Sequence, residues 1–458
     1  MNARARIAIA GGGPSGLMIG RLLAQDGHEV EILEAGDGIG GLCRSRTVEG
    51  HAFDLAGGHI MYTRDRRVAD FWTELFADDP CVVTERRAAI LHARDHWVAY
   101  PFENALGELP LEHNLECTEG EIRAHLRRAH EPPPRDFDAW IEWKMGPGIA
   151  RHFMRPYNRK IWKADLAQVS TEWIADRVPD APLADILRAS LGETTAGYVH
   201  QSTFRYPRHG GFAAIHERIA APIADRIRLH RRVERIERAR DGGWLVDGVR
   251  CDHVVSTVPL HALPALMPDL PADVAGAARA LRYRGVAGYL FGVALRDVRP
   301  LSWVYLPHPW QGPANRITYL SNYSPDNAPS GRGSILAEVT YVPGDEPDVS
   351  PAGQRALARA LADAGILHLE DVTVMDAALN PVSYILYDLD FEAKRNAVLS
   401  HLDALDGFHA LGRFGRYEYH NSDQCLAQAL DLHARLAPLL ARGGGPAAGP
   451  ASRPGGPP

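Results

Sequence analysis

The sequence predicts an α/β fold in which a parallel sheet is combined with an inserted helical part and an antiparallel sheet. An apolar run at residues 7–10 leads into a glycine-rich turn and a helix-like segment. Residues from about 106 to 192 show helical periodicity broken by proline clusters. From about residue 285 to 342, short β-rich runs alternate with Pro, Gly and Asn, as in an antiparallel sheet.

The glycine-rich turn has the form of a dinucleotide-binding motif. The run Ile7-Ala8-Ile9-Ala10 lacks alternation, which is typical of a strand buried in a parallel sheet. Three glycines then follow in the spacing G-x-G-x-x-G, namely Gly11, Gly13 and Gly16. They would let backbone N–H groups and a helix N-terminus approach a pyrophosphate. A second strand delivers Glu34, 18 residues after Gly16, where an acid that binds the ribose is expected. This pattern predicts a Rossmann-like domain.

Composition indicates a cytoplasmic enzyme of several parts. The chain has 458 residues, no apolar run long enough to span a bilayer and no signal-peptide pattern. Its net charge of −7 argues against nucleic acid as a partner, so a phosphate ligand would need locally placed arginines. Five cysteines without C-x-x-C spacing predict neither disulfides nor a metal site. Residues 443–458 are rich in Gly, Pro and Ala, which predicts a disordered tail.

Further motifs resemble a large family of FAD proteins that contains amine oxidases, protoporphyrinogen oxidases and UDP-galactopyranose mutases. Gly40-Gly41 resembles the second glycine pair of that family, and Gly412-Arg413-Phe414-Gly415 its last flavin-contacting loop. The resemblance implies FAD as the cofactor. It also implies the cofactor-binding residues, which besides Gly11, Gly13, Gly16 and Glu34 are Gly41, Gly58, His59, Arg87, Val233, Gly412, Arg413, Asp423 and Gln424.

Four blocks are similar to UDP-galactopyranose mutases, and more to the eukaryotic type than to the bacterial one. They are His96–Asn104, Asp138–Val178 with its segment FMRPYNRKIW, Thr203–Gly211 and Ile317–Asn327. By this resemblance the FAD-binding domain comprises residues 1–85, 203–262 and 405–442, and the helical domain residues 105–202. Residues 86–104 and 263–404 would form the antiparallel sheet that binds substrate.

The resemblance implies an isomerase that interconverts the pyranose and furanose forms of a nucleotide sugar, with UDP-galactose as the default substrate. In the family, N5 of reduced FAD attacks the anomeric carbon and expels the nucleoside diphosphate, which later returns. The protein must therefore hold the diphosphate and keep the flavin reduced. NADPH or NADH is the expected reductant, although the sequence has no separate motif for it. A homo-oligomer is left open, and neither a membrane nor nucleic acid is expected as a partner.

The catalytic residues implied by the resemblance are His59, on a glycine loop against the flavin, and the diphosphate-binding arginines Arg177 and Arg316. Phosphate or sugar contacts are expected from Tyr305, Tyr323, Tyr384 and Tyr419. Tyr387 is a rival of Tyr384, because the Tyr-Pro of the family is Tyr384-Ile385 here. Around the base of the nucleotide, the resemblance implies Tyr100, Phe102, Asn158 and Trp162.

Two departures from the family leave the base and the sugar undetermined. Glu103 stands where the eukaryotic-type enzymes usually have glutamine, and Gln201 where they have asparagine near the substrate. A carboxylate accepts hydrogen bonds from N3–H of uracil or thymine, or from N1–H and the amino group of guanine, but repels a carbonyl oxygen. Two other functions remain open: an FAD-dependent oxidoreductase of the amine or protoporphyrinogen oxidase type, and a flavoprotein that binds nucleotide sugar without turnover.

Overall fold

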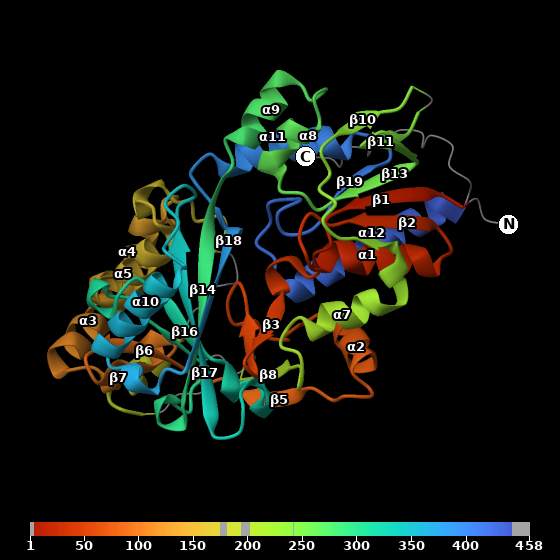
Figure 1. Ribbon diagram of the computed structural model, residues 1–458. Helices are drawn as coiled ribbons and strands as arrows, with labels where there is room; N and C mark the ends of the chain where they lie inside the picture. Colours follow the sequence, from red (N-terminus) through yellow and green to blue (C-terminus); the bar gives the residue numbers. More distant parts are fainter. Residues whose placement is uncertain (1–3, 175–180, 194–201, 241, 442–458) are drawn as a thin grey trace.

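The computed structural model describes residues 4–174, 181–193, 202–240 and 242–441 (Figure 1). It confirms the α/β fold with a parallel and an antiparallel sheet. The parallel sheet has the strand order β19-β13-β1-β2-β9, and each neighbouring pair is parallel. Its strands are β1 (Arg6–Ala10), β2 (Glu29–Leu33), β9 (Ile227–Arg228), β13 (His253–Ser256) and β19 (Phe408–Ala410).

Helix α1 follows β1 directly and packs against other helices beside this sheet. It begins after Gly13 with proline in its first turn, where the missing N–H costs nothing. Gly16 must lack a side chain, because a Cβ there would overlap the carbonyl oxygen of Gly11. The helices in this layer are α1 (Pro14–Gln25), α2 (Arg66–Leu75), α7 (Ala214–Ala220) and α12 (Ser422–Ala441).

The second sheet has seven strands in the order β18-β14-β17-β16-β15-β6-β7, and all its pairs are antiparallel except β15 with β6. Helix α10 (Pro351–Asp363) packs its apolar face on this sheet. The strands are β6 (Ala88–Ala93), β7 (His96–Ala99), β14 (Arg282–Ala294), β15 (Trp303–Tyr305), β16 (Arg316–Tyr319), β17 (Arg332–Tyr341) and β18 (Val374–Leu386).

The remaining strands form three small sheets. The pairs β3 (Ser45–Val48) with β4 (His51–Asp54) and β5 (Val82–Glu85) with β8 (Thr203–Tyr206) are antiparallel. The third small sheet consists of β10 (Ile236–Arg238), β11 (Trp244–Val246) and β12 (Val249–Cys251). The five cysteines are free.

The inserted helical part lies beside the seven-stranded sheet (Figure 1). Helix α3 crosses α4 closely at glycines, since a Cβ on Gly146 would collide with the backbone of Gly120. Helix α4 is kinked at Gly146, whose φ is 75°. The elements are α3 (Leu111–Arg128), α4 (Phe137–Ile149), a π-helical turn (Ala150–Met154), α5 (Arg155–Trp162) and α6 (Leu183–Ser190). Within the described ranges, no helix is both long enough and apolar enough to cross a bilayer.

Helices α8 (Leu263–Leu266), α9 (Ala272–Arg279) and α11 (Phe391–Asp403) lie at the end of the molecule near β19 (Figure 1). Helix α11 contacts both α9 and β19. Helix α11 thus reaches the parallel sheet, although the predicted boundaries at residues 262 and 405 group it with the substrate sheet. The division of the chain into domains stays a prediction. The predicted tail 443–458 lies outside the described residues.

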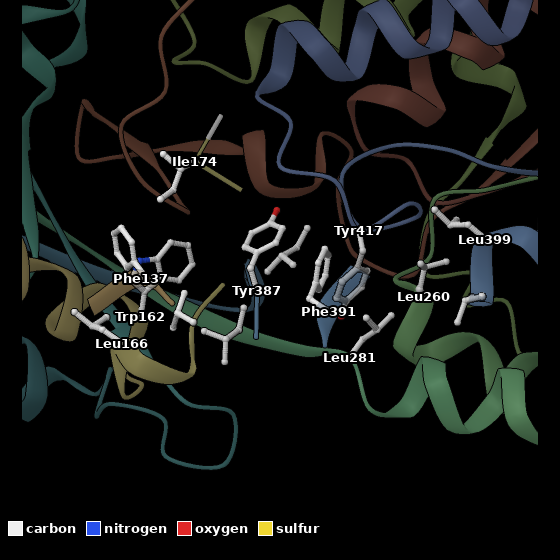
Figure 2. Packing of buried hydrophobic residues seen from close by; sticks show 14 of the residues in the cluster. Phe137, Trp162, Leu166, Ile174, Leu260, Leu281, Tyr387, Phe391, Leu399 and Tyr417 are labelled. Atoms are coloured by element: carbon white, nitrogen blue, oxygen red, sulfur yellow. The ribbon is translucent and has the colours of Figure 1, made fainter. Parts of the chain in front are cut away.

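One apolar core runs through the molecule from the helical part to the parallel sheet. Figure 2 shows Phe137 and Trp162 at one end, Tyr387 and Phe391 in the middle, and Tyr417 toward the other end. Tyr387 packs edge-on against Phe391, with ring centroids 4.5 Å apart. Because this core is continuous, the helical part and the parallel sheet are held in one relative position.

A buried arginine also ties the helical part to the sheet. Arg284 on β14 is 3% exposed, and its guanidinium donates to the carbonyl oxygens of Trp162 at 2.7 Å and Lys163 at 3.1 Å. These carbonyls end α5, where Lys163 adopts a left-handed conformation. Arg284 therefore caps the helix from the neighbouring sheet.

Replacing Arg284 with alanine should destabilise the protein, because it removes the donor to the buried carbonyl of Trp162 and to the partly buried carbonyl of Lys163. Each hydrogen bond to a charged group contributes about 1.5–3 kcal/mol, so we expect a loss of about 3 kcal/mol or more. Arg282→Ala, at an exposed position of the same strand, is the matched control and should change little. Thermal unfolding of both variants measures the difference, and equal melting temperatures would contradict this role of Arg284.

Candidate active site

A cavity of about 1000 Å³ lies where the two large sheets meet. One wall comes from residues that follow the parallel strands β1, β2 and β13, which is the edge where open α/β sheets bind ligands. The other wall comes from β15, β16 and β18 of the seven-stranded sheet. The cavity therefore has a nucleotide-binding end and a second end lined by the antiparallel sheet.

At the nucleotide-binding end, the glycine turn and the acid lie next to each other. Glu34 accepts hydrogen bonds at 2.7 Å from the N–H groups of Gly12 and Gly36. Gly11 has φ of 109°, in a region that favours glycine, and a Cβ there would overlap Thr257. Five of the predicted cofactor residues line this end: Gly11, Gly13, Glu34, Gly41 and Val233. Gly16 lies behind the turn, where it allows close packing.

Two helices direct their N-termini into the cavity. Helix α1 begins without a side-chain cap, so the N–H groups of its first turn are available to an anion. At the start of α12, Asp423 lines the cavity, and burial raises the pKa of its carboxyl group. Gln424 instead accepts a hydrogen bond from the N–H of Asn421 at 3.0 Å, so it caps the helix.

The loop that carries His59 is tightly packed between the two sheets. A Cβ on Gly57, whose φ is 123°, would lie 2.8 Å from the carboxyl carbon of Glu338. A Cβ on Gly58 would lie 2.6 Å from Thr318. Both glycines are therefore needed to bring the loop to the cavity, which Gly58 and His59 line. The His59 ring stacks on Phe212, with centroids 5.1 Å apart.

The His59 imidazole is neutral at neutral pH. Burial lowers its pKa to about 4, and the nearby positive charges of Arg316 and Arg413 add to this. Its Nδ1 is buried and has no hydrogen-bond partner within the described part of the chain. Asp54 lies at the start of the loop and accepts from Tyr206 at 2.8 Å and from the N–H of Phe212 at 3.1 Å. Burial raises the pKa of Asp54 to about 6.

Arg316 lines the cavity from the edge of β16 and is paired with a buried carboxylate. Its Nε and Nη2 donate to the two carboxylate oxygens of Glu338 at 2.8 and 2.9 Å. Glu338 is 1% exposed and faces Arg316 on the adjacent strand β17. This two-point contact fixes the plane of the guanidinium.

Aromatic side chains and a second arginine form the rest of this wall. Tyr305, Tyr384 and Tyr419 all line the cavity. Arg413 lies over the Tyr419 ring, 4.6 Å from its centroid, and donates to the carbonyl oxygens of His420 and Ser383. Its Nε is buried without a hydrogen-bond partner among the residues that the structure describes. Tyr384 faces the cavity, whereas its rival Tyr387 is 3% exposed and belongs to the core.

Several predicted substrate residues lie behind the cavity wall. Tyr323 and Phe102 are almost completely buried. Asn158 accepts from the Trp162 indole at 3.1 Å and donates to the carbonyl of Met154, so this pair is satisfied inside the core. Tyr100 packs against Tyr305 with ring centroids 4.8 Å apart and thus contacts the wall. Burial raises the pKa of the Tyr100 phenol, and the nearby Tyr305 and Glu103, the latter 9% exposed, add to this.

Of the neighbouring arginines Arg86 and Arg87, Arg86 lines the cavity and Arg87 does not. Arg87 is exposed and pairs with Glu85 at 2.6 Å. Arg86 lines the cavity and lies 5.1 Å from the centroid of the Trp303 ring. Arg177 and Gln201 lie outside the described residues.

Sequence reasoning also missed three residues that shape the site. Glu338 and Asp54 hold Arg316 and the His59 loop, and Trp173 lines the cavity. A lone acid within an apolar strand, as in ILAEVTYV, was the available signal for Glu338.

These features fit a flavin dinucleotide. The glycine turn, the acid and the uncapped α1 N-terminus suit the adenosine diphosphate part. The cavity volume is at the upper end of the range for small-molecule sites. Nδ1 of His59 and Nε of Arg413 are buried and find no partner in the described ranges, so a bound ligand could satisfy them.

The low pKa of His59 should make the protein less stable in acid. The pKa of a histidine is ordinarily 6.5, and that of His59 in the folded protein is about 4. As the pH falls, the unfolded chain therefore binds this proton first. The free energy of unfolding should decrease as the pH drops from about 6.5 to 4. Above pH 6.5 the His59 imidazole is neutral in both the folded and the unfolded protein, so it no longer makes stability depend on pH. His59→Gln should therefore show a smaller loss of melting temperature between pH 7 and 5 than the unsubstituted protein.

His433 offers a matched control, because it pairs with Asp26 on the surface at 2.7 Å. His433→Gln should keep the acid sensitivity that His59 causes. If both variants lose stability with pH as the parent does, His59 is not the buried neutral group described above.

The chain resembles known flavoproteins along most of its length. A crystal structure of reduced UDP-galactopyranose mutase is 26% identical, with a TM-score of 0.82 over 95% of this chain and 96% of that one. A putative protoporphyrinogen oxidase from Exiguobacterium sp. 255-15 is 18% identical, with a TM-score of 0.72 over 95% and 99%. Putrescine oxidase bound to putrescine is 16% identical, with a TM-score of 0.62 over 95% and 99%. At these two lower identities the likeness shows the fold alone.

A curated relative is an uncharacterized protein in the nifH2 3′ region of Methanothermococcus thermolithotrophicus, 44% identical over 60 residues. The match spans 13% of this chain and 58% of that protein. The family model described as flavin containing amine oxidoreductase matches residues 14–360. With the glycine turn, the acid and the cavity in place, this match establishes that the chain belongs to the flavin-containing amine oxidoreductase family.

Proposed function

We propose that the protein is a flavin-dependent nucleotide-sugar mutase that interconverts pyranose and furanose forms, with UDP-galactose as the first substrate to test. The observation that carries the proposal is Arg316, which is held by the buried Glu338 and lines the cavity together with Tyr305 and Tyr384. The identity of 26% with reduced UDP-galactopyranose mutase over nearly the whole of both chains supports it.

Arg316 keeps enough donors to bind a diphosphate while it is paired with Glu338. A guanidinium has five N–H donors, and the carboxylate takes two of them. The remaining three can donate to phosphate oxygens, and the phenols of Tyr305, Tyr384 and Tyr419 add neutral donors along the same wall. This set suits a leaving group that must be released and recaptured. Arg177, in the segment WIADRV, is proposed as the second arginine.

The charge of the cavity disfavours an amine substrate. Four of the lining residues are arginines, namely Arg86, Arg232, Arg316 and Arg413. The lining carboxylates are Glu34 and Asp423, and Glu34 already accepts from two backbone N–H groups. A protonated amine would meet mainly positive charge, whereas a diphosphate would be attracted.

The chain's own residues would hold FAD at three places. The glycine turn and Glu34 would bind the adenosine diphosphate, Gly58 and His59 would lie against the ring system, and the α12 N-terminus with Gly412 and Arg413 would approach its polar edge. Bound in its reduced form, FAD supplies the nucleophilic N5 of the proposed reaction. The positive end of α12 and the Arg413 guanidinium would favour negative charge on the reduced cofactor. A neutral His59 would avoid placing another cation there.

Base recognition is proposed at Glu103 and Tyr100. Glu103 occupies the short helical turn Phe102–Asn104, directly behind Tyr100 and the cavity wall. Because its carboxylate can only accept when ionised, it would select a base that presents an N–H group. Uracil, thymine and guanine all satisfy this condition, which is why several nucleotide sugars are tested below.

The reduced protein should isomerise a nucleotide sugar, and the oxidised protein should not. We would incubate dithionite-reduced and oxidised protein anaerobically with UDP-, dTDP- and GDP-sugars and identify ring forms by NMR. NAD(P)H should start turnover but should not be consumed in proportion to product. Equal isomerisation rates in both redox states would rule out a reaction that needs reduced flavin. Consumption of NAD(P)H in proportion to product would instead support the oxidoreductase alternative.

Replacing Arg316 with glutamine should weaken binding of the nucleoside diphosphate by about 2 kcal/mol or more, which is roughly 30-fold. Part of this effect would come from Glu338, which is then buried without its partner. The double variant Arg316→Gln/Glu338→Gln should therefore recover stability and flavin content but not nucleotide affinity. Titration calorimetry with UDP and the flavin absorbance measure the two effects separately.

Arg299→Gln is the control, since this arginine lies over the Trp97 ring, 4.1 Å from its centroid, and does not line the cavity. It should leave UDP affinity unchanged. An unchanged affinity in Arg316→Gln would remove Arg316 from the diphosphate site.

A further inference from the structure

A group of histidines lies outside the cavity, at the edge of the seven-stranded sheet. His92 is on β6, His113 in the first turn of α3 and His152 in the π-helical turn Ala150–Met154. One nitrogen of each of these three rings lies within 4.8 Å of the others. His96 and His308 also contact His92, with ring centroids 5.9 and 6.1 Å away. Five of the chain's 21 histidines thus gather at one place.

The three rings are close enough for direct coordination of one ion. His92 Nε2 and His113 Nδ1 are 3.0 Å apart, and the ring centroids of His113 and His152 are 4.1 Å apart. Tetrahedral zinc with Zn–N bonds of 2.0–2.1 Å holds its nitrogen ligands roughly 3.3 Å apart. To bind zinc together, His92 Nε2 and His113 Nδ1 would need to move apart by only a few tenths of an ångström.

The surroundings provide what imidazole ligands require. Glu116 accepts from His152 Nε2 at 2.9 Å, and a carboxylate that supports a ligating histidine in this way is common at metal sites. Glu116 is itself held by Arg151 at 2.8 Å.

We propose that His92, His113 and His152 bind a divalent transition metal, for which zinc is the best candidate. Imidazole nitrogens suit zinc, copper and nickel, whereas magnesium and calcium prefer oxygen ligands. The fourth position falls to water or to one of the two flanking histidines. The sequence had predicted no metal site, because the three histidines come from distant parts of the chain.

The position of the site indicates a structural function. It joins the β6–β7 hairpin to α3 and to the turn that precedes α5, so it would fasten the helical part to the sheet edge. A chain of aromatic rings leads from the site to the cavity. The ring centroids of His92 and Phe102 are 6.1 Å apart, and those of Phe102 and Phe153 are 5.4 Å apart. The Phe153 ring in turn lies 6.2 Å from that of Tyr305 in the cavity wall. None of the three proposed ligands lines the cavity. The metal would therefore support the aromatic wall from behind.

The second histidine-containing group is a useful contrast. His368 and the carboxylates of Asp297 and Asp371 also lie close together. There, however, Asp297 accepts from His368 at 2.6 Å, and Arg296 pairs with Asp371. Asp371 is therefore already paired with an arginine and Asp297 with His368, so we do not expect this group to retain a metal ion.

The test uses full-length protein purified without a histidine tag or a nickel column. After equilibration with zinc and gel filtration, elemental analysis should find about one zinc per chain in the parent and in His368→Ala. His113→Ala and His152→Ala should lose this zinc while keeping the parent flavin content. Glu116→Gln should bind zinc about ten- to hundredfold more weakly. Added zinc should raise the melting temperature of the parent but not that of His113→Ala.

X-ray absorption spectroscopy of the zinc-loaded parent tests the ligands directly, so the result does not depend on whether the variants fold. It should show histidine nitrogens as ligands, with the multiple scattering typical of imidazole rings. Zinc at background level in the parent, equal zinc in the parent and both histidine variants, loss of zinc in His368→Ala, or a spectrum without imidazole would each overturn the proposal.

Discussion

The ion pair between Arg316 and Glu338 is the interaction on which the rest of the site depends. It joins neighbouring strands and places a cation at the cavity surface with a carboxylate buried beneath it. The same carboxylate packs against Gly57, and the N–H of Gly58 lies 3.4 Å from it. One buried acid therefore positions both the arginine and the histidine loop. Such a pair stabilises only while both members are present, because either charge alone would be buried without compensation.

This arrangement explains why the loop is rich in glycine and why His59 is neutral. The backbone at Gly57 and Gly58 fills the space between Glu338 and Thr318, so no side chain can be added there. His59 is thereby brought near Arg316 and Arg413, whose charges oppose its protonation. A protonated imidazole here would compete with the arginines for the same anion-binding region. The electrostatic character of the cavity thus follows from packing at a few backbone positions.

Local patterns predicted the nucleotide-binding end well, because its residues act within one β-α-β unit. Gly11, Gly13 and Glu34 line the cavity, and Gly16 packs behind the turn. Residues fixed by long-range pairing were harder to predict. The choice between Arg86 and Arg87, or between Tyr384 and Tyr387, depends on which side chain faces the cavity, and a shift of one or three positions changes that face. Glu338 could not be assigned because its partner lies on another strand.

The cavity lies at the edge of the parallel sheet, as in other α/β proteins, and its chemistry depends on side chains that the second sheet contributes. That sheet must therefore be held firmly against the helical part, whose aromatic residues back the wall. Arg284 on β14 connects the two parts near one edge of the sheet, and the histidine group at β6 connects them near the other. Because the predicted anion-binding groups span both parts, these connections determine whether the groups converge on one ligand.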